Sequence, residues 1–372
     1  MDLRIFTEPQ QGASHADLLA VARAARDGGF SAFFRSDHVL TMGGDGLPGP
    51  SDSFVSLGAI ATQVPDIRLG TLVASATFRH PSMLAIAAAH IDDISGGRLE
   101  LGIGSGWNEA EHIAYGLDFG GSFAERFDRL TEQLEILTGL WATPIGGRFE
   151  YSGRHYALSG APGLPKPRQT GADGTPRVPI IVGGHGPKRT PALAARFADE
   201  FNVGFIDLLA TTTQFDRVRV ACESIGRDPG SLVYSAAHLL CVGSDEAQFA
   251  RRAAAIGHDP AVVRSSPLAG TVAEVIDTLG RWAEAGLQRS YLQVLDLADL
   301  EHIALVAPRR CCRRPCRGDP GGHRHPTLSI RRRPAGCSVG CCGTPPGVCG
   351  GDRVRPVTSV GTLIPWPSPG PG

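Results

Sequence analysis

The amino-acid sequence predicts an α/β protein, a (β/α)8 TIM barrel with loop insertions, over residues 1–307. The first observation behind this prediction is that short apolar runs alternate with helical patterns along the whole stretch. The second is that eight strand–helix units can be counted in it. Eight units in about 300 residues fit a closed barrel better than the alternative, an open doubly wound sheet.

Four units precede residue 143. Each begins with a short apolar strand and continues into a helix whose apolar residues recur at helical spacing. Ser122 and Glu125 form a capping-box pattern at the start of the fourth helix. The expected strands are 3–6, 32–36, 67–75 and 98–104, and the expected helices are 15–29, 53–64, 81–94 and 122–142.

Residues 143–178 interrupt this alternation, and within them residues 147–158 predict a β-hairpin followed by irregular chain. Four further units follow, with residues 257–270 expected as a loop and Thr271 and Glu274 as a second capping box. The expected strands are 179–184, 201–205, 232–243 and 289–295, and the expected helices are 189–200, 212–226, 245–256, 271–286 and 296–307.

The chain changes character after Ala307. Residues 308–372 are rich in Arg, Pro, Gly and Cys, hold seven of the nine cysteines and show no periodicity. Structural zinc sites need two spaced pairs of ligands, which these cysteine clusters lack, so a metal or redox module is the less favoured interpretation. The favoured interpretations are a disordered tail and an out-of-frame translation of a GC-rich gene that cuts the last helix short. We expect no metal site in the chain.

Composition argues against several classes of function. A formal net charge of −1 argues against nucleic acid or an anionic membrane as the main partner. No apolar run reaches the ~18 residues of a membrane span, and residues 1–12 lack the pattern of a signal peptide. A cytoplasmic enzyme that acts on a small molecule is therefore expected.

The loops that follow the strands should carry the chemistry, because the active site of a (β/α)8 barrel lies at the carboxyl ends of its strands. Asp37 and His38 follow the second strand as an adjacent titratable pair. A histidine there serves either as a structural hydrogen-bond partner or as a catalyst, and the two are about equally favoured. Ser75 and Thr77 follow the third strand and suit close approach by a flat ligand, although both residue types also cap helices locally.

Residues 99–112, LELGIGSGWNEAEH, contain Gly102, Gly104 and Gly106 after the fourth strand. A dinucleotide-binding turn needs G-x-G-x-x-G in the first strand–helix unit. Here Trp107 stands in the place of the third glycine, and three strand–helix units precede this one. The stretch therefore meets neither requirement of a dinucleotide-binding turn. What remains is a strand end without side chains, against which a planar group can lie. The polar candidates that follow it are Asn108, Glu109 and Glu111.

A second glycine-rich turn follows the fifth strand, with Gly183, Gly184 and Gly186 directly ahead of a helix. Their backbone N–H groups, together with Lys188 and Arg189, predict a phosphate site. A flexible turn without a ligand explains the same glycines about as well.

Taken together, these residues resemble the luciferase-like family of flavin and deazaflavin oxidoreductases, and within it the branch that depends on coenzyme F420. The resemblance covers residues 1–307 and leaves the tail unmatched. Each motif is modest alone, but their order and spacing are specific. The motifs are RIFTEPQQG, GFSAFFRSDH, RLGTLVASATFRHP, ISGGRLELGIGSGWNEAEHIAYG, ERFDRLTEQLEILTGLW and IIVGGHGPKRTPALAARFADEFNV.

The resemblance implies a cofactor ring across the strand ends, with a non-proline cis peptide at the end of the third strand, near Leu72 and Val73. In the sugar-phosphate dehydrogenase branch a glutamate acts as proton donor where Trp107 stands here, so a sugar phosphate is not the expected substrate. The residues implied beside the ring are Asp37, His38, Ser75, Thr77, Gly106, Trp107 and Asn108, and those implied at its phosphate are Gly183, Gly184, His185 and Gly186.

The implied activity is that of an F420-dependent oxidoreductase, which transfers a hydride between C5 of the deazaflavin and a small organic substrate. His38 is the first candidate for the acid or base, with Asp37 beside it, because the ordinary pKa of histidine lies near neutrality. One alternative is an FMN-dependent monooxygenase with a separate flavin reductase, and another is a barrel that binds the cofactor without turnover. A homodimer is also expected. Specificity is expected to depend on the loops at 40–52, 143–178 and 257–270.

Overall fold

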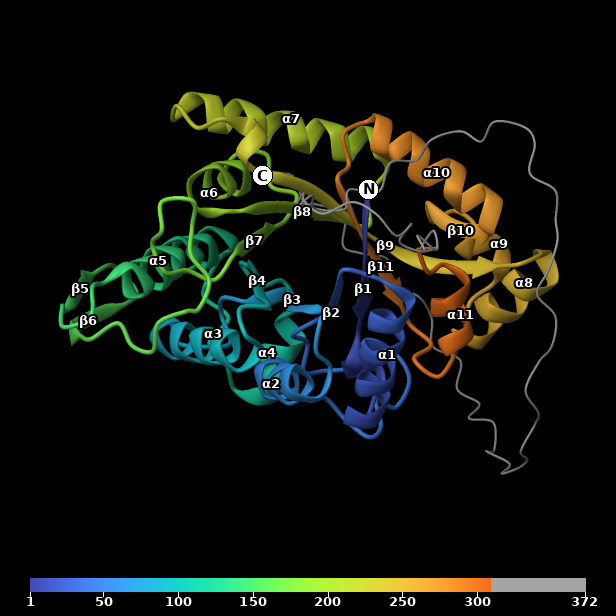
Figure 1. Cartoon of the computed structure of the whole chain (residues 1–372), viewed down its shortest axis with the longest axis horizontal. Helices are drawn as coiled ribbons and strands as arrows, with labels where there is room; N and C mark the ends of the chain where they lie inside the picture. The colour runs from blue at the N-terminus through green and yellow to red at the C-terminus, as the bar shows by residue number, and fades with distance from the viewer. Residues whose placement is uncertain (309–372) are drawn as a thin grey trace, which may run out of the picture.

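The computed structural model describes residues 1–308, and eight parallel strands within them close into a barrel (Figure 1). The strands follow one another around the barrel in chain order, and β11 pairs with β1 to close it, from Asp2 opposite Arg289 to Thr7 opposite Val294. The predicted (β/α)8 fold is confirmed. The barrel strands are β1 (Asp2–Thr7), β2 (Ala32–Arg35), β3 (Arg68–Ser75), β4 (Leu99–Gly104), β7 (Ile180–Gly183), β8 (Glu200–Gly204), β9 (Val233–Gly243) and β11 (Arg289–Val294).

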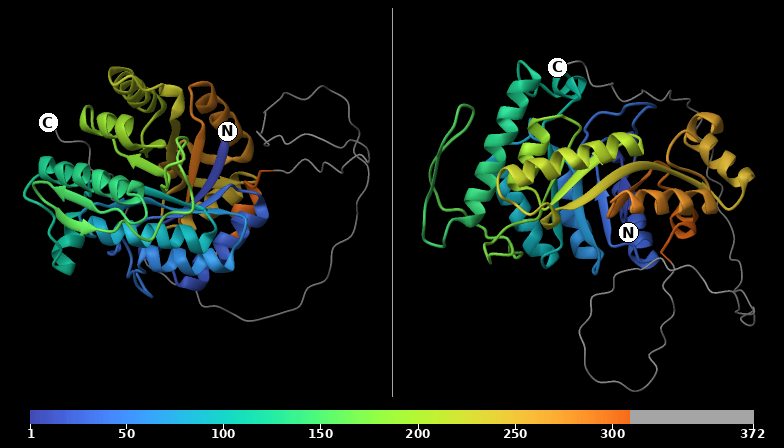
Figure 2. Two further views of the ribbon diagram at one scale, coloured as in Figure 1. Left: turned by 60° about the vertical axis from the view of Figure 1, so that its left-hand side comes forward. Right: turned by 90° about the horizontal axis from the view of Figure 1, so that it is seen from above.

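Helices cover the outside of the barrel, as Figures 1 and 2 show. They form where one face of the sequence is apolar, and in α1 the buried residues Leu18, Val21 and Ala22 recur at helical spacing. Ser14 and Asp17 start this helix with a reciprocal capping box. The outer helices are α1 (His15–Gly28), α2 (Ser53–Gln63), α3 (Pro81–Ser95), α5 (Phe123–Ala142), α6 (Arg189–Phe197), α7 (Leu208–Ser224), α8 (Glu246–Ala255), α10 (Val272–Glu284) and α11 (Leu300–Leu305).

One short helix departs from the sequence prediction. The residues after β4 were expected as a loop but form α4 (Glu109–Tyr115), which Gly116 ends in a left-handed conformation. At the start of α5, Ser122 caps the helix as predicted. Glu125, however, turns its carboxylate to the N–H of Gly121, so the expected capping box is only half formed.

The region predicted as a loop at 257–270 also contains regular structure. It holds α9 (Pro260–Val263) and the strand β10 (Leu268–Thr271), which pairs with the last residues of β9. This strand forms because β9 continues past its last pairing with β11 and leaves backbone groups without partners there. Directly after it, the predicted capping box of Thr271 and Glu274 is confirmed.

The predicted hairpin is present as β5 (Phe149–Ser152) and β6 (Ala157–Ala161), an antiparallel pair outside the barrel. It lies along α5 at the edge of the molecule in both views of Figure 2. The hydroxyl of Tyr151 donates a hydrogen bond to Glu135 of α5 across 2.6 Å. The insertion is therefore fixed to the outer helix layer.

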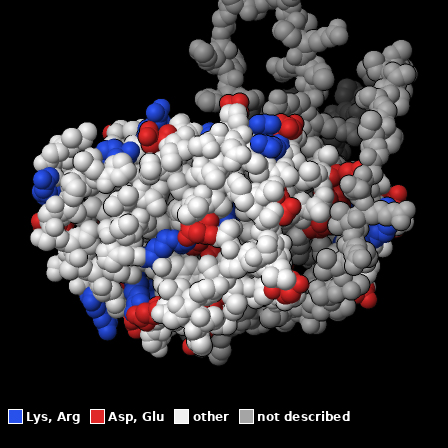
Figure 3. All heavy atoms as spheres, turned by 90° about the horizontal axis from the view of Figure 1, so that it is seen from below, with Lys and Arg blue, Asp and Glu red and all other residues white. Residues whose placement is uncertain are grey.

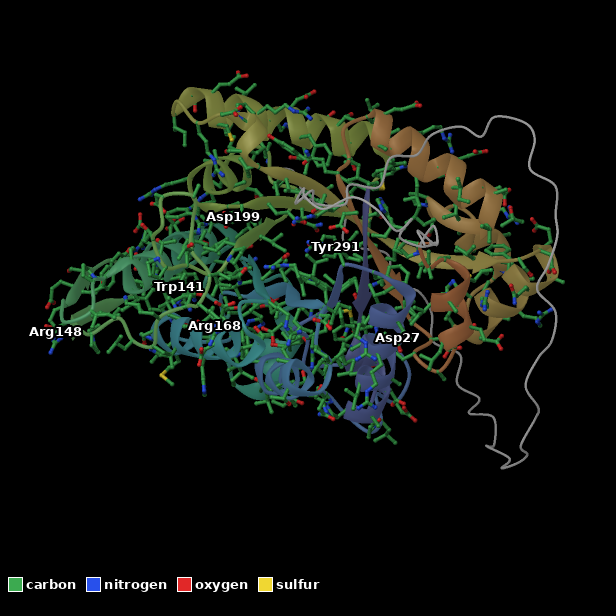
Figure 4. All side chains as sticks on the ribbon, in the orientation of Figure 1. Asp27, Trp141, Arg148, Arg168, Asp199 and Tyr291 are labelled. Atoms are coloured by element: carbon green, nitrogen blue, oxygen red, sulfur yellow. The ribbon has the colours of Figure 1, made fainter. Side chains whose placement is uncertain are left out.

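Charged side chains fill the amino-terminal half of the barrel interior. Arg4 pairs with Glu100 and donates to the hydroxyl of Tyr291 across 3.1 Å, and Tyr291 donates to Glu200 across 2.8 Å. Figure 4 shows Tyr291 in the middle of the molecule. Burial raises the pKa of Glu100, but the charges of Arg4 and Arg68 outweigh it and lower that pKa to about 2. These charges can be buried because they are paired. Their side chains fill the amino-terminal end of the barrel, so the carboxyl end of the strands is the end left for chemistry.

No helix within residues 1–308 is long and apolar enough to cross a membrane. On the face drawn in Figure 3, charged side chains of both signs are scattered over a largely uncharged surface. The tail predicted at 308–372 lies outside the described residues, apart from Pro308.

Candidate active site

The carboxyl end of β3 has a non-proline cis peptide between Leu72 and Val73, at the position that the family resemblance implied. The pairing of β3 with β4 shifts register there, between Thr71 and Ala74. Leu72 is buried with side chains from β1, β2, β7, β9 and β11, which only the barrel interior can bring together. Val73 packs against this cluster and stays partly exposed.

Glycines on the neighbouring strands leave room for Val73. A Cβ atom on Gly104 or on Gly183 would lie 3.1 Å from a methyl carbon of Val73. A Cβ atom on Gly102 would collide with the backbone carbonyl of Thr71. The glycines of β4 therefore serve the close approach of β3. Val73 and the glycine backbone together form the surface that a planar group could cover.

Gly106 lies in the loop after β4 with a φ of +82°, in the left-handed region. A Cβ atom there would lie 2.6 Å from Oγ of Ser75 and 2.7 Å from Oγ1 of Thr77. Both the backbone conformation and the closeness of these hydroxyls require glycine. The fold thus brings together the loops after β3 and β4 that the sequence singled out separately.

Ser75, Thr77 and His112 form a hydrogen-bonded chain whose direction can be deduced. Nδ1 of His112 lies 2.7 Å from the backbone carbonyl of Asn108, which can only accept, so Nδ1 donates. In a neutral imidazole, Nε2 then accepts from the Thr77 hydroxyl across 2.6 Å. The oxygen of Thr77 in turn accepts from the Ser75 hydroxyl across 2.6 Å. Ser75 is left to present lone pairs, and so acts as an acceptor toward a ligand.

Glu111, which the sequence analysis named as a polar candidate, lies in α4 and holds His38 in place. Nδ1 of His38 lies 2.9 Å from Oε2 of this carboxylate. Oε1 accepts from the backbone N–H groups of Val39 and Leu40 across 2.7 and 3.1 Å. The Glu111 side chain is 1% exposed and that of His38 is 18% exposed. Three donors therefore fix the carboxylate, and Nε2 is the ring nitrogen of His38 that a ligand could reach.

The electrostatics of this pair favour a proton on His38. Burial lowers the pKa of His38, but the hydrogen bond and charge of Glu111 outweigh it, and Glu8 and Asp37 add to the rise. Burial raises the pKa of Glu111, yet His38 and the two backbone N–H groups bring the net shift downward. The pair therefore tends toward an imidazolium beside a carboxylate.

Trp107 lies against the His38 ring in an edge-to-face arrangement, with 5.4 Å between the ring centroids and an interplanar angle of 77°. Its side chain is 40% exposed. An indole N–H cannot supply a proton as a carboxylic acid does, so Trp107 offers a wall to the site rather than an acid. The titratable ring in contact with Trp107 is that of His38.

Asp37 is buried, and both of its carboxylate oxygens have partners. Oδ1 accepts from the Ser53 hydroxyl across 2.5 Å, and Oδ2 pairs with Arg79 across 2.5 Å. Arg79 also pairs with Asp52, the N-cap residue of α2, across 2.7 Å. These contacts tie the loop after β2 to the loop after β3. They give Asp37 a positioning role for His38, and its contact with a cofactor ring stays a prediction.

The loop from Gly183 to Gly186 leads into α6, whose first turn is capped by no side chain. Thr190 in that turn is 1% exposed, and its hydroxyl has no hydrogen-bond partner among the described residues. A Cβ atom on Gly186 would lie 2.9 Å from this hydroxyl oxygen. An uncapped helix end beside an unsatisfied hydroxyl suits a phosphate group.

The other side chains of this loop are directed elsewhere. His185 accepts a hydrogen bond from the N–H of Gly204 in β8 across 3.2 Å, and burial lowers the pKa of His185. Arg189 turns to α5 and pairs with Asp128 across 2.5 Å, so it does not supply the free positive charge that the sequence suggested. Lys188 is exposed and forms no ion pair with a described residue.

A polar network at the ends of β1, β2 and β11 was missed by sequence reasoning. Glu8 accepts from Gln10 across 2.8 Å and from Gln293 across 2.7 Å, and Gln10 accepts from the Ser36 hydroxyl across 2.7 Å. Glu8, Gln10 and Ser36 follow strands, which is the criterion that singled out Asp37, whereas Gln293 lies within β11. His112 was missed as well, because a seven-residue helix is too short to show periodicity.

Known proteins are similar to this chain over the whole of the barrel. A profile of the family described as luciferase-like monooxygenase matches residues 1–314. The chain is 33% identical over 215 residues to an F420-dependent glucose-6-phosphate dehydrogenase of Nakamurella multipartita, covering 57% of this chain and 59% of that protein. It is 31% identical over 207 residues to pyrimidine monooxygenase RutA of Klebsiella pneumoniae, covering 54% and 52%. The chain thus spans less than two thirds of the length of these curated relatives.

A solved structure shares the fold. An F420-dependent secondary alcohol dehydrogenase in complex with an F420-acetone adduct superposes with a TM-score of 0.70 at 18% identity. The superposition covers 82% of this chain and 96% of that chain. At this level of identity the similarity shows the common barrel.

Proposed function

This chain belongs to the luciferase-like monooxygenase family, and we propose that it is an oxidoreductase that uses the deazaflavin coenzyme F420 on a small organic substrate. The observation that carries the proposal is the contact of His38 with Glu111, 2.9 Å from Nδ1 to the carboxylate, beside the glycine-lined strand ends around Val73. The relatives named F420-dependent glucose-6-phosphate dehydrogenase support the choice of cofactor.

The residues present fit such a cofactor. Val73 and the backbone of β4 would lie against the ring. Ser75, as an acceptor, would take a hydrogen bond from a ring N–H group. Gly184, Gly186 and Thr190 would hold the phosphate, because the Thr190 hydroxyl is buried without a partner and Cβ atoms on the glycines would crowd it.

When bound, the reduced deazaflavin supplies a hydride to an organic acceptor. His38 would hold the accompanying proton at Nε2, the nitrogen that does not contact Glu111, and pass it to the substrate atom that gains negative charge. Glu111 stabilises the imidazolium until the proton leaves. Trp107 would shield the His38 ring from water, and the contacts of Asp37 with Ser53 and Arg79 keep the loop that carries His38 in place.

The similarity to pyrimidine monooxygenase RutA favours a second candidate function. In that case the chain is an FMN-dependent monooxygenase, which receives reduced flavin from a separate reductase. The surface around Val73 and the loop before α6 would serve either ring system, so binding experiments must separate the two.

The first experiment titrates the purified full chain with F420 and with FMN, and follows quenching of the cofactor fluorescence. Preferential saturable binding of F420 supports the proposal, preferential binding of FMN supports the second candidate, and no binding of either contradicts both. If F420 binds but its absorbance stays constant when each organic substrate is added, the result would count against an enzyme.

The second experiment tests His38 directly. His38→Ala should still bind the cofactor, with turnover about 10²- to 10⁴-fold lower, the range for loss of a general acid. His90→Ala, at an exposed position on α3, is the matched control and should retain full turnover. Full turnover of His38→Ala would remove His38 from the mechanism.

A further inference from the structure

Four polar side chains form a layer across the barrel interior at the carboxyl ends of β1, β2 and β11. The buried apolar cluster around Leu72 lies next to this polar layer. The members of that cluster on these three strands are Phe6, Phe34 and Tyr291. Side chains two positions apart in a strand point to the same face, so Glu8, Ser36 and Gln293 follow them into the interior. Gln10 completes the polar layer through its contacts with Glu8 and Ser36.

The polar layer lies on the side of the barrel away from the surface around Val73. In the closed order of the eight strands, β11 lies opposite β4, whose glycines make room for Val73. A planar group on that surface would therefore leave the space between it and the polar layer for a second, smaller molecule. The side chains of the layer are placed to contact that molecule.

The direction of the hydrogen bonds in the polar layer follows from Glu8. A carboxylate can only accept, so Nε2 of Gln293 donates to Oε1 of Glu8 across 2.7 Å. For the same reason Nε2 of Gln10 donates to Oε2 of Glu8 across 2.8 Å. Gln10 thus turns its own Oε1 to Ser36, whose hydroxyl donates to it across 2.7 Å. Gln10 and Ser36 are buried, so the carboxylate is held from the protein side by groups that have little freedom to move.

The charge of Glu8 is not balanced by a cation within residues 1–308. Among the other carboxylates of the site, Asp37 pairs with Arg79, and Glu111 lies beside His38. Glu8 accepts from two neutral amides and forms no ion pair with a described residue. It is also partly exposed, whereas the amides that hold it are buried. A negative charge with free lone pairs therefore faces the open end of the barrel.

We propose that Glu8 binds a protonated amine, so that the small organic substrate of this chain is one that carries an ammonium group. The inference rests on the proposed function. An ammonium group has three N–H donors and no acceptor. The polar layer offers three matching acceptors, because each oxygen of Glu8 keeps a lone pair and Oε1 of Gln293 accepts from no described residue. Gln293 is thus a second residue that would determine specificity.

The charges of the occupied site would balance. The carboxylates of Glu8 and Glu111 would face two cations, the ammonium group of the substrate and the imidazolium of His38. Glu8 also lies close enough to His38 for its charge to add to the rise of the His38 pKa. A substrate bound at Glu8 would therefore lie near the side chain that holds the proton.

A different role for Glu8 makes the opposite prediction. If Glu8 served only to keep His38 protonated, its removal would make the site less positive, and a cationic ligand would then bind more tightly. If Glu8 binds the ammonium group itself, the same change makes a cationic ligand bind more weakly. The sign of the effect therefore separates the two roles.

The test compares two ligands of the same shape, 1-amino-2-propanol, which is protonated at neutral pH, and 2-butanol, in which a methyl group replaces the ammonium group. Dissociation constants are measured by saturation-transfer NMR in the full chain, with and without F420. The wild-type chain should bind the amino alcohol about tenfold more tightly at low salt, the effect of one hydrogen bond to a charged group. Salt should reduce this preference, because Glu8 is partly exposed.

Three variants locate the preference. Glu8→Gln keeps the shape of the side chain and should abolish the preference while leaving the affinity for 2-butanol unchanged. Gln293→Leu keeps the charge of Glu8 but removes an acceptor and a positioning amide, so the preference should fall to about threefold. Glu109→Gln removes an exposed carboxylate from α4 and should leave the preference intact.

The outcomes separate the inference from the function on which it rests. Equal affinity for the two ligands in a wild-type chain that binds F420 overturns the inference and leaves the proposed function standing. A preference that survives or increases in Glu8→Gln also overturns it. If F420 does not bind, the proposed function fails and the inference fails with it. Should Glu8→Gln melt at a lower temperature than wild type, Gln293→Leu decides, and a preference unchanged in that variant overturns the inference.

Discussion

The carboxylate of Glu111 lies 2.9 Å from Nδ1 of His38, although 73 residues separate the two in the sequence. This contact joins a helix after β4 to the loop after β2, and it raises the pKa of a histidine that burial alone would lower. The sequence left open whether His38 is a structural or a catalytic histidine. In the fold, its structural contact with Glu111 sets its pKa, which is the property that a catalytic acid or base depends on.

Replacing Glu111 with Gln removes the charge and keeps the shape of the side chain. We expect the pKa of His38 to fall, because burial, which lowers it, would no longer be opposed by this carboxylate. The pH dependence of the His38 ring chemical shift in NMR spectra measures this directly. Glu109→Gln, at an exposed position on the same helix, should leave the titration as it is in the wild type. An identical titration in Glu111→Gln would refute the pairing.

The same pair makes a pH-dependent contribution to stability. The pKa of His38 is raised in the folded state and that of Glu111 is lowered. The contribution is therefore complete between the ordinary values of 4.5 and 6.5 and is lost as the pH rises through the raised pKa of His38. The free energy of unfolding of wild type minus that of Glu111→Gln should decrease above neutral pH in urea titrations.

Replacing Gly106 with Ala should destabilise the chain in two ways. A residue with a Cβ atom in the left-handed region costs about 1–2 kcal/mol, and the crowding of Ser75 and Thr77 adds about 1–3 kcal/mol. Gly116→Ala is the matched control, because Gly116 has a similar φ and open space around it. Urea unfolding should show a larger loss for Gly106→Ala, and equal losses would contradict the close approach.

Replacing Thr190 with Val should have opposite consequences for stability and for binding. The hydroxyl has no partner among the described residues, so its removal should leave the free energy of unfolding unchanged or raise it by about 1 kcal/mol. The affinity for a phosphate-bearing cofactor should fall about tenfold, since one hydrogen bond to a charged group is lost. Thr71→Val, whose hydroxyl donates to the Gly102 carbonyl across 2.8 Å, should instead lose stability. Unchanged cofactor affinity in Thr190→Val would argue against the phosphate site.

Two buried histidines should make the chain sensitive to acid. Burial lowers the pKa of His238 to about 4, and burial together with the charge of Arg252 lowers that of His302 to about 4. The unfolded chain therefore binds protons that the folded chain does not, and stability falls as the pH drops from 6.5 toward 4. A pKa lowered to this extent corresponds to about 3 kcal/mol of unfolding free energy for each residue.

The measurement is the melting temperature as a function of pH for wild type and for His238→Phe. The variant should lose less stability between pH 6.5 and 4, because one of the two protonations is removed. His90→Phe, at an exposed position, should follow the wild type. A variant that is as sensitive to acid as the wild type would contradict the burial argument.

Local pattern in the sequence determined the barrel. Alternating apolar strands and amphipathic helices depend on near neighbours, so the strands from Leu3 to Leu295 could be placed to within a few residues. The rule that barrel loops carry the chemistry then pointed to Asp37, His38 and the two glycine-rich turns. Pattern failed where an element was too short or depended on a partner, as with the helix after β4 and the strand beside β9.

Only the tertiary structure decided what these residues do to one another. The glycines at the end of β4 and just after it could have served a ligand alone. The fold shows that Gly104 and Gly106 make room for Val73 and Ser75 of β3 and for Thr77 in the loop after it. The charge on Glu111 acts on His38 because the closed barrel places their two loops side by side. Sequence records residue types and spacing along one chain, whereas hydrogen-bond direction and pKa depend on distances between loops that lie far apart in that chain.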